Sequence, residues 1–315
     1  MGPARAHDSH VAAWRDRGWV LIEGLVPTDE IDAATRDLRE MFPTAEEYHA
    51  DPAGERLRRI GQPAEAKAAY TWPAAGPGFR PDQHRWQALF PFALPELNRL
   101  CVHAAIVDFA ERALQTRDLR LYQALASAKY AGETNYEQPM HTDRNHSWLP
   151  ARNVAPWWHL ETFLYLSDVN EGNAPTHLVA LPDSAGRATT VPLAMPKGDP
   201  ELYAAELAAA GVRGSLLAYR TDVFHRGVDL TAPGAARFIL GLGFKVAGHD
   251  WIGYHTQQSK STSPAWVRFA EGSTPRELEL FGWPPPGHPI WDAALLDETA
   301  ERYPDLDLDP WRAAL

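Results

Sequence analysis

The hydrophobic pattern of the chain starts with one short strand, continues with apolar residues at helical spacing, and changes to strand spacing from about residue 119. Residues 18–26, GWVLIEGLV, predict a short strand. Residues 27–30, PTDE, then supply a turn, an N-cap candidate and first-turn acids for a helix. The apolar stripe expected on that helix consists of Ile31, Ala34, Leu38 and Phe42.

The next two segments differ in how regular they are. Residues 44–92 are rich in Pro, Gly and polar residues, and we predict irregular covering structure there, with a helical stretch around residues 53–68. A second helix is predicted from about Pro95, which suits a first-turn position, to Leu114. Its apolar stripe consists of Leu97, Leu100, Ala104, Val107 and Leu114.

The pattern then changes to short strands. Residues 119–130, LRLYQALASAKY, alternate with a period of two. This alternation predicts one shared face for Leu119, Leu121, Gln123, Leu125, Ser127 and Lys129. Further strands are predicted at residues 159–169, 177–182, 188–193, 214–220 and 237–246.

This order of elements predicts a mainly β fold with flanking helices. Because the helices come first and the strands later, a barrel or sandwich is favoured over alternating βαβ units. The segment after Gly248 is rich in Trp and Pro and is expected to be a C-terminal cover. We therefore expect one domain over residues 1–315, with a helical part at about 1–115, a core at about 118–247 and the cover at about 248–315.

Composition narrows the class of protein. The formal net charge is −11 and no block of Lys or Arg interrupts the acidic balance, so neither nucleic acid nor an anionic membrane is an expected partner. Cys101 is the one cysteine, which excludes an intrachain disulfide and a Cys-rich zinc site. An apolar leader and a run of 18 apolar residues are both missing from the sequence. We expect a cytoplasmic protein.

The residues that could carry chemistry gather in residues 139–148, PMHTDRNHSW. In an extended strand residues i and i+2 point the same way, so His141 and Asp143 can reach one metal ion. A third ligand is predicted at His225, in the segment GSLLAYRTDVFHRGV. Two histidines and one carboxylate form the facial triad of non-haem Fe(II) oxygenases, which leaves room for an oxoacid and O2. The alternative is two unrelated polar turns and a core histidine.

Arg237 follows these candidate ligands and opens the apolar strand RFILGLGF. A guanidinium can grip a carboxylate through two parallel hydrogen bonds. A co-substrate such as 2-oxoglutarate chelates iron at one end and offers a carboxylate at the other. We therefore expect Arg237 to hold that second end, with an ordinary strand-end salt bridge as the alternative.

These segments together resemble the phytanoyl-CoA dioxygenase family of Fe(II)- and 2-oxoglutarate-dependent oxygenases. The resemblance covers about residues 10–250. Ser167 and Ala174 stand where the family commonly has Asp and Gly. The matching segments are GWVLIEGLVPTDEIDAATRDL, LYQALASAKY, HTD, LETFLYLSDVNEGNAPTHLVALPDS and LLAYRTDVFHRGV.

The resemblance implies a fold and a set of site residues. The implied fold is a double-stranded β-helix, the cupin-like jelly roll, with helices packed on one sheet. The implied iron ligands are His141, Asp143 and His225, with Arg237 on the C5 carboxylate of 2-oxoglutarate. Gln123 matches a family position that contacts the co-substrate, and Arg80 or a neighbour is a poorly aligned candidate for a further contact.

Several residues near these positions allow two interpretations. Thr142 is a candidate for contact with the oxoacid or the substrate, or is only part of the strand. Gln123 is a co-substrate contact or an inward amide bonded to backbone. Trp148, Trp157 and Trp158 line a pocket for an apolar or aromatic substrate, or pack the lid and helices onto the barrel.

The function predicted from the sequence is an Fe(II)- and 2-oxoglutarate-dependent dioxygenase that hydroxylates a small-molecule metabolite and releases succinate and CO2. Asp143 favours hydroxylation or desaturation over halogenation, since halogenases related to the family have a small residue in its place. The alternatives are a cupin-like metalloenzyme that does not use 2-oxoglutarate and a catalytically silent binding module. The sequence does not identify the substrate.

Overall fold

Two antiparallel sheets form the centre of the molecule. The computed structural model describes residues 6–60, 86–93, 95–133, 137–143, 153, 155–156, 158–189, 198–248 and 264–315. The six-stranded sheet has the order β1 (Trp19–Ile22), β7 (Leu216–Tyr219), β4 (His159–Tyr165), β9 (Ala236–Val246), β3 (Leu119–Tyr130) and β2 (Gln87–Leu89). The short sheet has the order β6 (Leu207–Ala208), β5 (His177–Leu178) and β8 (His225–Arg226).

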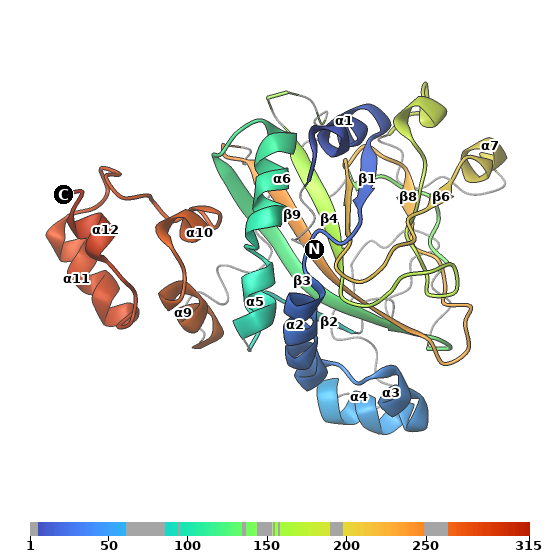
Figure 1. Ribbon diagram of the computed structural model, residues 1–315, viewed down its shortest axis with the longest axis horizontal. Coiled ribbons are helices and arrows are strands. Elements are labelled where there is room, and N and C mark those ends of the chain that lie inside the picture. The colour runs from blue at the N-terminus through green and yellow to red at the C-terminus, as the bar shows by residue number, and fades with distance from the viewer. Residues whose placement is uncertain are drawn as a thin grey trace.

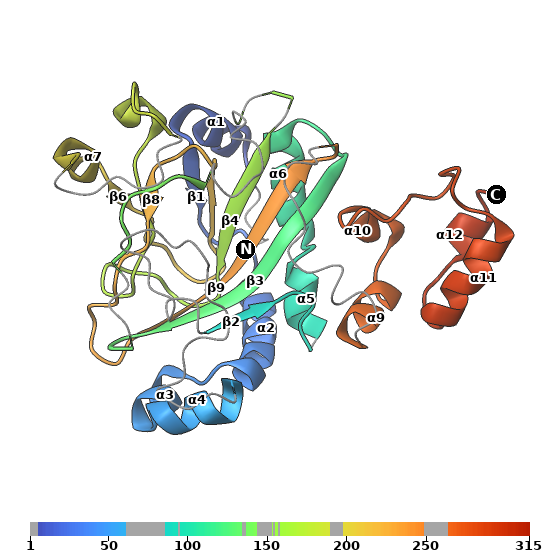
Figure 2. The same ribbon diagram turned by 180° about the vertical axis from the view of Figure 1, so that it is seen from behind.

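Helices cover one side of the six-stranded sheet, and the short sheet lies on the other side (Figures 1 and 2). The covering helices are α2 (Thr28–Met41), α5 (Pro95–Leu100) and α6 (Ala104–Leu114). This two-sheet arrangement with flanking helices confirms the predicted jelly-roll fold class. Among the described residues, no helix is long and apolar enough to cross a membrane.

The remaining helices lie around this centre. Helix α1 lies beside β1, and α9 to α12 extend outward past α5 (Figure 1). The division of the chain into a helical part, a core and a cover within one domain stays a prediction. The bounds of these helices are α1 (Asp8–Arg17), α3 (Ala45–Ala50), α4 (Pro52–Ile60), α7 (Pro200–Ala204), α9 (Pro264–Glu271), α10 (Pro275–Glu279), α11 (Ala293–Arg302) and α12 (Asp309–Arg312).

The helix predicted from Pro95 to Leu114 is two helices. The chain turns after α5, and the imidazole of His103 accepts a hydrogen bond of 3.3 Å from the Ala105 N–H at the start of α6. A side-chain cap of this kind satisfies a donor that has no partner within the helix, so it stabilises a new helix start inside an apolar stripe that is otherwise continuous.

The segment predicted to be irregular contains regular elements where it is described. Helix α3 begins with a capping box, in which the Thr44 hydroxyl and the Glu47 carboxylate each accept a hydrogen bond from the other residue's N–H. Helix α4 and strand β2 follow, and residues 61–85 lie outside the described part of the chain. The strand predicted at residues 188–193 also lies mostly outside it, from residue 190 onward.

A bulge in β3 changes which side chains share a face. Leu121 pairs with Phe244 and Gln123 pairs with Gly243, which leaves Tyr122 as an extra residue. Leu119 and Leu121 therefore join the apolar core under the helices. The predicted common face of residues 119–129 is wrong for these two leucines, because one inserted residue reverses the alternation.

The two faces of the six-stranded sheet differ in composition. The face under the helices, here called the helix face, is mainly apolar where β3, β4 and β9 meet, and the buried Thr162 hydroxyl on it donates to the Leu242 carbonyl at 3.0 Å. The opposite face, here called the inner face, carries buried polar and charged groups beside the apolar contacts with the short sheet. The helix face includes Ala124, Ala126, Ala128, Leu160, Leu164, Leu240, Leu242 and Phe244, and the inner face includes Gln123, Lys129, Glu161, Tyr219, Arg237, Gly241 and Gly243.

Candidate metal centre

Backbone pairing brings the three predicted ligands together. His141 and His225 lie opposite each other and exchange both backbone hydrogen bonds, at 3.0 and 2.8 Å. The N–H of Asp143 donates to the Thr221 carbonyl at 2.9 Å, in the turn that precedes His225. This ladder holds residues 141–143 against residues 221–225. The two distant sequence segments are therefore fixed side by side by main-chain hydrogen bonds.

The side chains of the triad converge on one point. His225 Nε2 lies 3.5 Å from Asp143 Oδ2, and His141 Nε2 lies 3.9 Å from Asp143 Oδ1. One candidate ligand atom from each residue lies within 4.8 Å of the others, and all three residues are buried. Within the described part of the chain this is the one group of His, Cys, Asp or Glu with that geometry. Two imidazoles and a carboxylate suit a divalent transition-metal ion.

The hydrogen bonds of the imidazoles leave their Nε2 atoms available as ligands. His141 Nδ1 lies 2.9 Å from the Pro139 carbonyl, and His225 Nδ1 lies 3.1 Å from the Val223 carbonyl. A carbonyl can only accept, so each Nδ1 carries the proton and each Nε2 presents a lone pair. Such outer contacts orient metal-binding histidines and fix their tautomer. The triad therefore has the protonation pattern that metal coordination requires.

Tyr219 contacts the triad and was missed by the sequence analysis. Its hydroxyl donates to Asp143 Oδ2 at 3.0 Å, and its ring centroid lies 4.7 Å from that of His225. Burial, followed by the negative charges of Asp143 and Glu161, raises the pKa of Tyr219 well above its ordinary value, so the hydroxyl keeps its proton. The alternation of β7, which places Tyr219 beside Leu217 on the inner face, is the signal that could have identified it.

Two buried cations lie side by side on the inner face. Lys129 and Arg237 are direct partners in the pairing of β3 with β9, and both are buried. Burial, followed by the positive charge of Arg237, lowers the pKa of Lys129 well below its ordinary value. The sequence indicates a role for Arg237 and none for Lys129, because the pairing of these two residues depends on the register between β3 and β9. Together they form a region that favours an anion.

Arg237 is anchored by a residue with unusual backbone geometry. Its Nη1 donates to the carbonyl of Ala174, which is fully buried and has a φ of 58°. This left-handed conformation costs a non-glycine residue on the order of 1 kcal/mol or more. Ala174 stands where the family that the sequence resembles commonly has glycine. The strained carbonyl holds the guanidinium in place on the inner face.

The other predicted contacts are placed differently. Gln123 lies on the inner face, partly exposed, across Gly243 from Glu161. Thr142 is buried, and its hydroxyl donates to the Thr189 carbonyl at 2.6 Å. A binding role for either residue stays a prediction.

Of the three candidate pocket tryptophans, Trp158 lies within the described residues. Trp158 packs edge-on against Trp14, with ring centroids 5.6 Å apart, and lies under the guanidinium of Arg220. It therefore packs against the helical core, which is the second of the two interpretations given above. Trp148, Trp157 and Arg80 lie outside the described residues.

Glu161 is a buried carboxyl group on the inner face. It pairs with Tyr219 across β4 and β7, and it accepts a hydrogen bond from the Tyr122 hydroxyl. Gly243 makes room for this contact, because a Cβ there would meet the Tyr122 ring at 2.6 Å. Burial raises the pKa of Glu161 to about 8. The group is therefore neutral over most of the physiological pH range.

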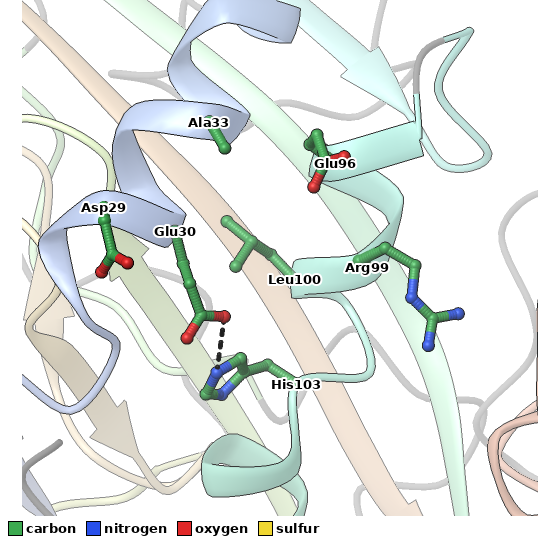
Figure 3. Close-up of a pocket in the computed structure, with 7 residues that line it drawn as sticks. All are labelled: Asp29, Glu30, Ala33, Glu96, Arg99, Leu100 and His103. Carbon is green, nitrogen blue, oxygen red and sulfur yellow. Dashed lines mark ion pairs between the residues drawn. The ribbon is translucent and has the colours of Figure 1, made fainter. Parts of the chain in front are cut away.

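A separate hollow lies on the helical side of the molecule, between α2 and α5 (Figure 3). Its volume is about 280 Å³. The His103 Nε2 lies 3.1 Å from Glu30 Oε2 within it. Its acids do not form a metal-ligand group of the kind found at the triad. It is lined by Asp29, Glu30, Ala33, Glu96, Arg99, Leu100 and His103.

The fold resembles those of several solved proteins, some of them described as non-heme α-ketoglutarate-dependent enzymes. SnoK, a non-heme α-ketoglutarate-dependent carbocyclase from nogalamycin biosynthesis, matches with a TM-score of 0.54 at 18% identity, over 78% of this chain and 88% of SnoK. EctD from S. alaskensis, solved with 2-oxoglutarate and 5-hydroxyectoine, matches with a TM-score of 0.54 at 18% identity, over 80% and 82%. AviO1 from Streptomyces viridochromogenes Tue57 matches with a TM-score of 0.52 at 15% identity, over 78% and 97%.

At these identities the likeness shows the fold alone. The chain has the jelly-roll fold of non-heme α-ketoglutarate-dependent enzymes. No protein-family model matches the sequence, and no curated protein does. Membership of the phytanoyl-CoA dioxygenase family therefore stays a prediction.

Proposed function

We propose that this protein is an Fe(II)- and 2-oxoglutarate-dependent dioxygenase of the phytanoyl-CoA dioxygenase type that hydroxylates a small-molecule metabolite. The observation that carries the proposal is the buried His141–Asp143–His225 group, with ligand atoms within 4.8 Å and both imidazole tautomers set for coordination. The likeness in fold to SnoK and EctD supports the same class of chemistry. EctD was solved with a hydroxylated small molecule, which agrees with a small-molecule substrate.

The triad would hold Fe(II) from one side and leave the other side for the reactants. His141 and His225 contribute neutral nitrogen ligands and Asp143 contributes a negative charge, which together suit Fe(II). When bound, the ion with 2-oxoglutarate and O2 supplies the power to oxidise a C–H bond, and succinate and CO2 are released. The residues of the chain position these reactants and keep bulk water away from them.

Arg237 and Lys129 would hold the far carboxylate of 2-oxoglutarate. Arg237 offers a planar fork and Lys129 a point charge, and the two lie on adjacent strands. Burial and the positive charge of Arg237 lower the pKa of Lys129, and a bound carboxylate would favour the charged form of its amine.

The direct test is anaerobic reconstitution with Fe(II), followed by addition of 2-oxoglutarate and O2 with a panel of small metabolites. We expect one iron per chain and succinate release that a true substrate stimulates. Iron binding without any succinate would favour a cupin-like metalloenzyme that does not use 2-oxoglutarate. Failure to bind Fe(II) would favour the remaining alternative, a catalytically silent binding module.

A further inference from the structure

Three buried tyrosines of the β-structure use their hydroxyl groups in different ways. Tyr130 donates to the Pro43 carbonyl at 2.7 Å, and Tyr165 donates to the Ala209 carbonyl at 2.6 Å. Both bonds tie one backbone segment to another. Tyr219 instead donates to the carboxylate of Asp143 at 3.0 Å. Its hydroxyl therefore satisfies a group that belongs to the candidate metal centre.

The segment that carries Tyr219 surrounds Asp143 and His225. The Thr221 carbonyl accepts from the Asp143 N–H at 2.9 Å, and the Val223 carbonyl lies 3.1 Å from His225 Nδ1. With Tyr219 on the Asp143 side chain, every second residue from 219 to 223 makes a contact that orients one of the two ligands. Strand β7 fixes where this segment begins, because Tyr219 pairs with both Trp19 and Glu161 in the sheet.

We propose that Tyr219 is a positioning residue that sets the orientation and the binding mode of the ligand Asp143; this inference rests on the metal site of the proposed function. A carboxylate can rotate about its last bond and can coordinate through one oxygen or both. The Tyr219 hydroxyl bond ties Oδ2 to β7 and fixes this rotation. The ring of Tyr219 also packs 4.7 Å from His225, so one side chain orients two ligands.

The hydrogen bond favours coordination through a single oxygen. An ion bound by both oxygens would compete with Tyr219 for the lone pairs of Oδ2. Coordination through one oxygen keeps more positions open for the oxoacid and O2. Tyr219 would therefore act on the reaction through the ligands that it orients, with its hydroxyl on Asp143 and its ring against His225.

The test uses Tyr219→Phe, which removes the hydroxyl and keeps the ring, with Tyr165→Phe as its matched control. Each variant loses one buried tyrosine hydroxyl of the six-stranded sheet that has a hydrogen-bond partner. Binding of Fe(II) and of Co(II) is measured anaerobically by equilibrium dialysis, together with the visible absorption of the Co(II) form and the melting temperature. Outer contacts of this kind typically alter metal affinity about 10- to 100-fold.

We expect Tyr219→Phe to weaken binding of both ions by about that factor and to change the Co(II) spectrum. Tyr165→Phe should lower the melting temperature and leave affinity and spectrum as in the wild type. In an Asp143→Ala background the hydroxyl has no ligand to orient, so Tyr219→Phe should cause no further loss of affinity.

Three results would overturn the inference. One is affinity of Tyr219→Phe within twofold of the wild type with an unchanged spectrum. Another is an undiminished loss in the Asp143→Ala background, which would give Tyr219 a general structural role. Failure of the wild-type protein to bind either ion would overturn both this inference and the proposed function, whereas the first two results leave the proposed function standing.

Discussion

The two faces of the six-stranded sheet are built from the same strands, but one packs an apolar core and the other carries polar side chains beside the candidate site. On the helix face, β9 contributes Leu240, Leu242 and Phe244, all buried in one apolar core. On the inner face, the same strand contributes Arg237 and two glycines beside the buried Glu161. Alternation along a strand places these two sets on opposite sides. Residues that stabilise the apolar core therefore alternate along one strand with residues that face the candidate site.

Burial has opposite energetic effects on the typical side chains of the two faces. A buried leucine gains free energy from the removal of apolar surface from water. A buried charge such as Lys129 or Arg237 loses its hydration and needs a partner. Lys129 lies 3.5 Å from the Val228 carbonyl, and Arg237 donates to the Ala174 carbonyl. We expect substitution of such polar groups to impair function more than stability, and substitution of an apolar residue on the helix face to do the reverse. The predictions below test this contrast.

The largest effect is expected at the triad. His141→Ala or His225→Ala should abolish turnover and weaken iron binding, because each removes one of the three candidate ligands. The fold should survive, since backbone bonds join the two segments whatever the side chains are. Iron stoichiometry and circular dichroism measure the two properties on the same sample.

The matched control for the triad lies on the helix face. Phe244→Ala should cost about 3–5 kcal/mol of stability by opening a cavity, while iron affinity in the folded protein stays near that of the wild type. Full iron occupancy in both histidine variants would contradict the assignment of these histidines as metal ligands.

The second effect concerns Arg237 and the co-substrate. Arg237→Lys keeps the charge and loses the planar fork, and a charge-assisted contact of this kind contributes about 1.5–3 kcal/mol. The apparent KM for 2-oxoglutarate should therefore rise about 10- to 100-fold. Arg237→Ala should raise it further, and iron binding should change little. Steady-state succinate formation against 2-oxoglutarate concentration gives the answer, and a KM within twofold for Arg237→Ala would make Arg237 a structural residue.

The third effect is a dependence of stability on pH at Glu161. Its pKa is about 8 in the folded protein against an ordinary value of 4.5, so between these pH values the folded state keeps a proton that the unfolded state has lost. Stability should therefore fall as pH rises through this window. Gln has no proton to lose, so Glu161→Gln should gain stability over the wild type from pH 5 to pH 8, by at most roughly 5 kcal/mol.

A half-buried glutamate, Glu206, gives the control with the opposite sign. Burial raises the pKa of Glu206, but hydrogen bonds from Arg226 and His177 outweigh it and lower the pKa to about 2. Its stabilising effect is present above the ordinary pKa and is lost as pH falls towards 2. Glu206→Gln should therefore be less stable than the wild type at neutral pH. Thermal melting across pH shows whether the two variants diverge, and parallel curves would contradict both assignments.

A smaller effect on stability is expected at Gly243, which pairs with Gln123 of β3 and with Glu161 of β4. An added methyl group would meet the Tyr122 ring at 2.6 Å, so Gly243→Ala should cost about 1–3 kcal/mol through overpacking. Gly241→Ala is the control, because its methyl group would meet Phe163 at 3.4 Å, closer to ordinary contact. Equal melting temperatures for the two variants would show that the Tyr122 ring moves freely.

The sharing of one site by His141 and Asp143 could be predicted from the sequence because their geometry is local. Two ligands separated by one residue share a face in any extended strand, and His225 follows a recognisable strand and turn. Lys129 and Tyr219 could not be predicted in the same way. Their roles depend on the register between strands far apart in the sequence, which periodicity does not specify.

The fold was predictable to the same extent. The strand at residues 119–130 was predicted with its observed bounds, and its bulge was not, because the apolar alternation continues across it. The break between α5 and α6 was also missed. The apolar stripe runs through it, and only the cap formed by His103 marks the new start.

The bulge in β3 has a consequence for how this chain tolerates changes of length. Deleting one residue from a central strand normally turns half of its side chains to the wrong face and is lost in evolution. Here Tyr122 is already surplus to the pairing, since Leu121 and Gln123 face adjacent residues of β9. A chain that lacks Tyr122 should keep both faces and lose only the contact with Glu161, which circular dichroism and thermal melting can confirm. The residue at position 122 can therefore be deleted from the middle of the sheet without a change of fold. Sequences descended from a common ancestor can differ in length by one residue at that point.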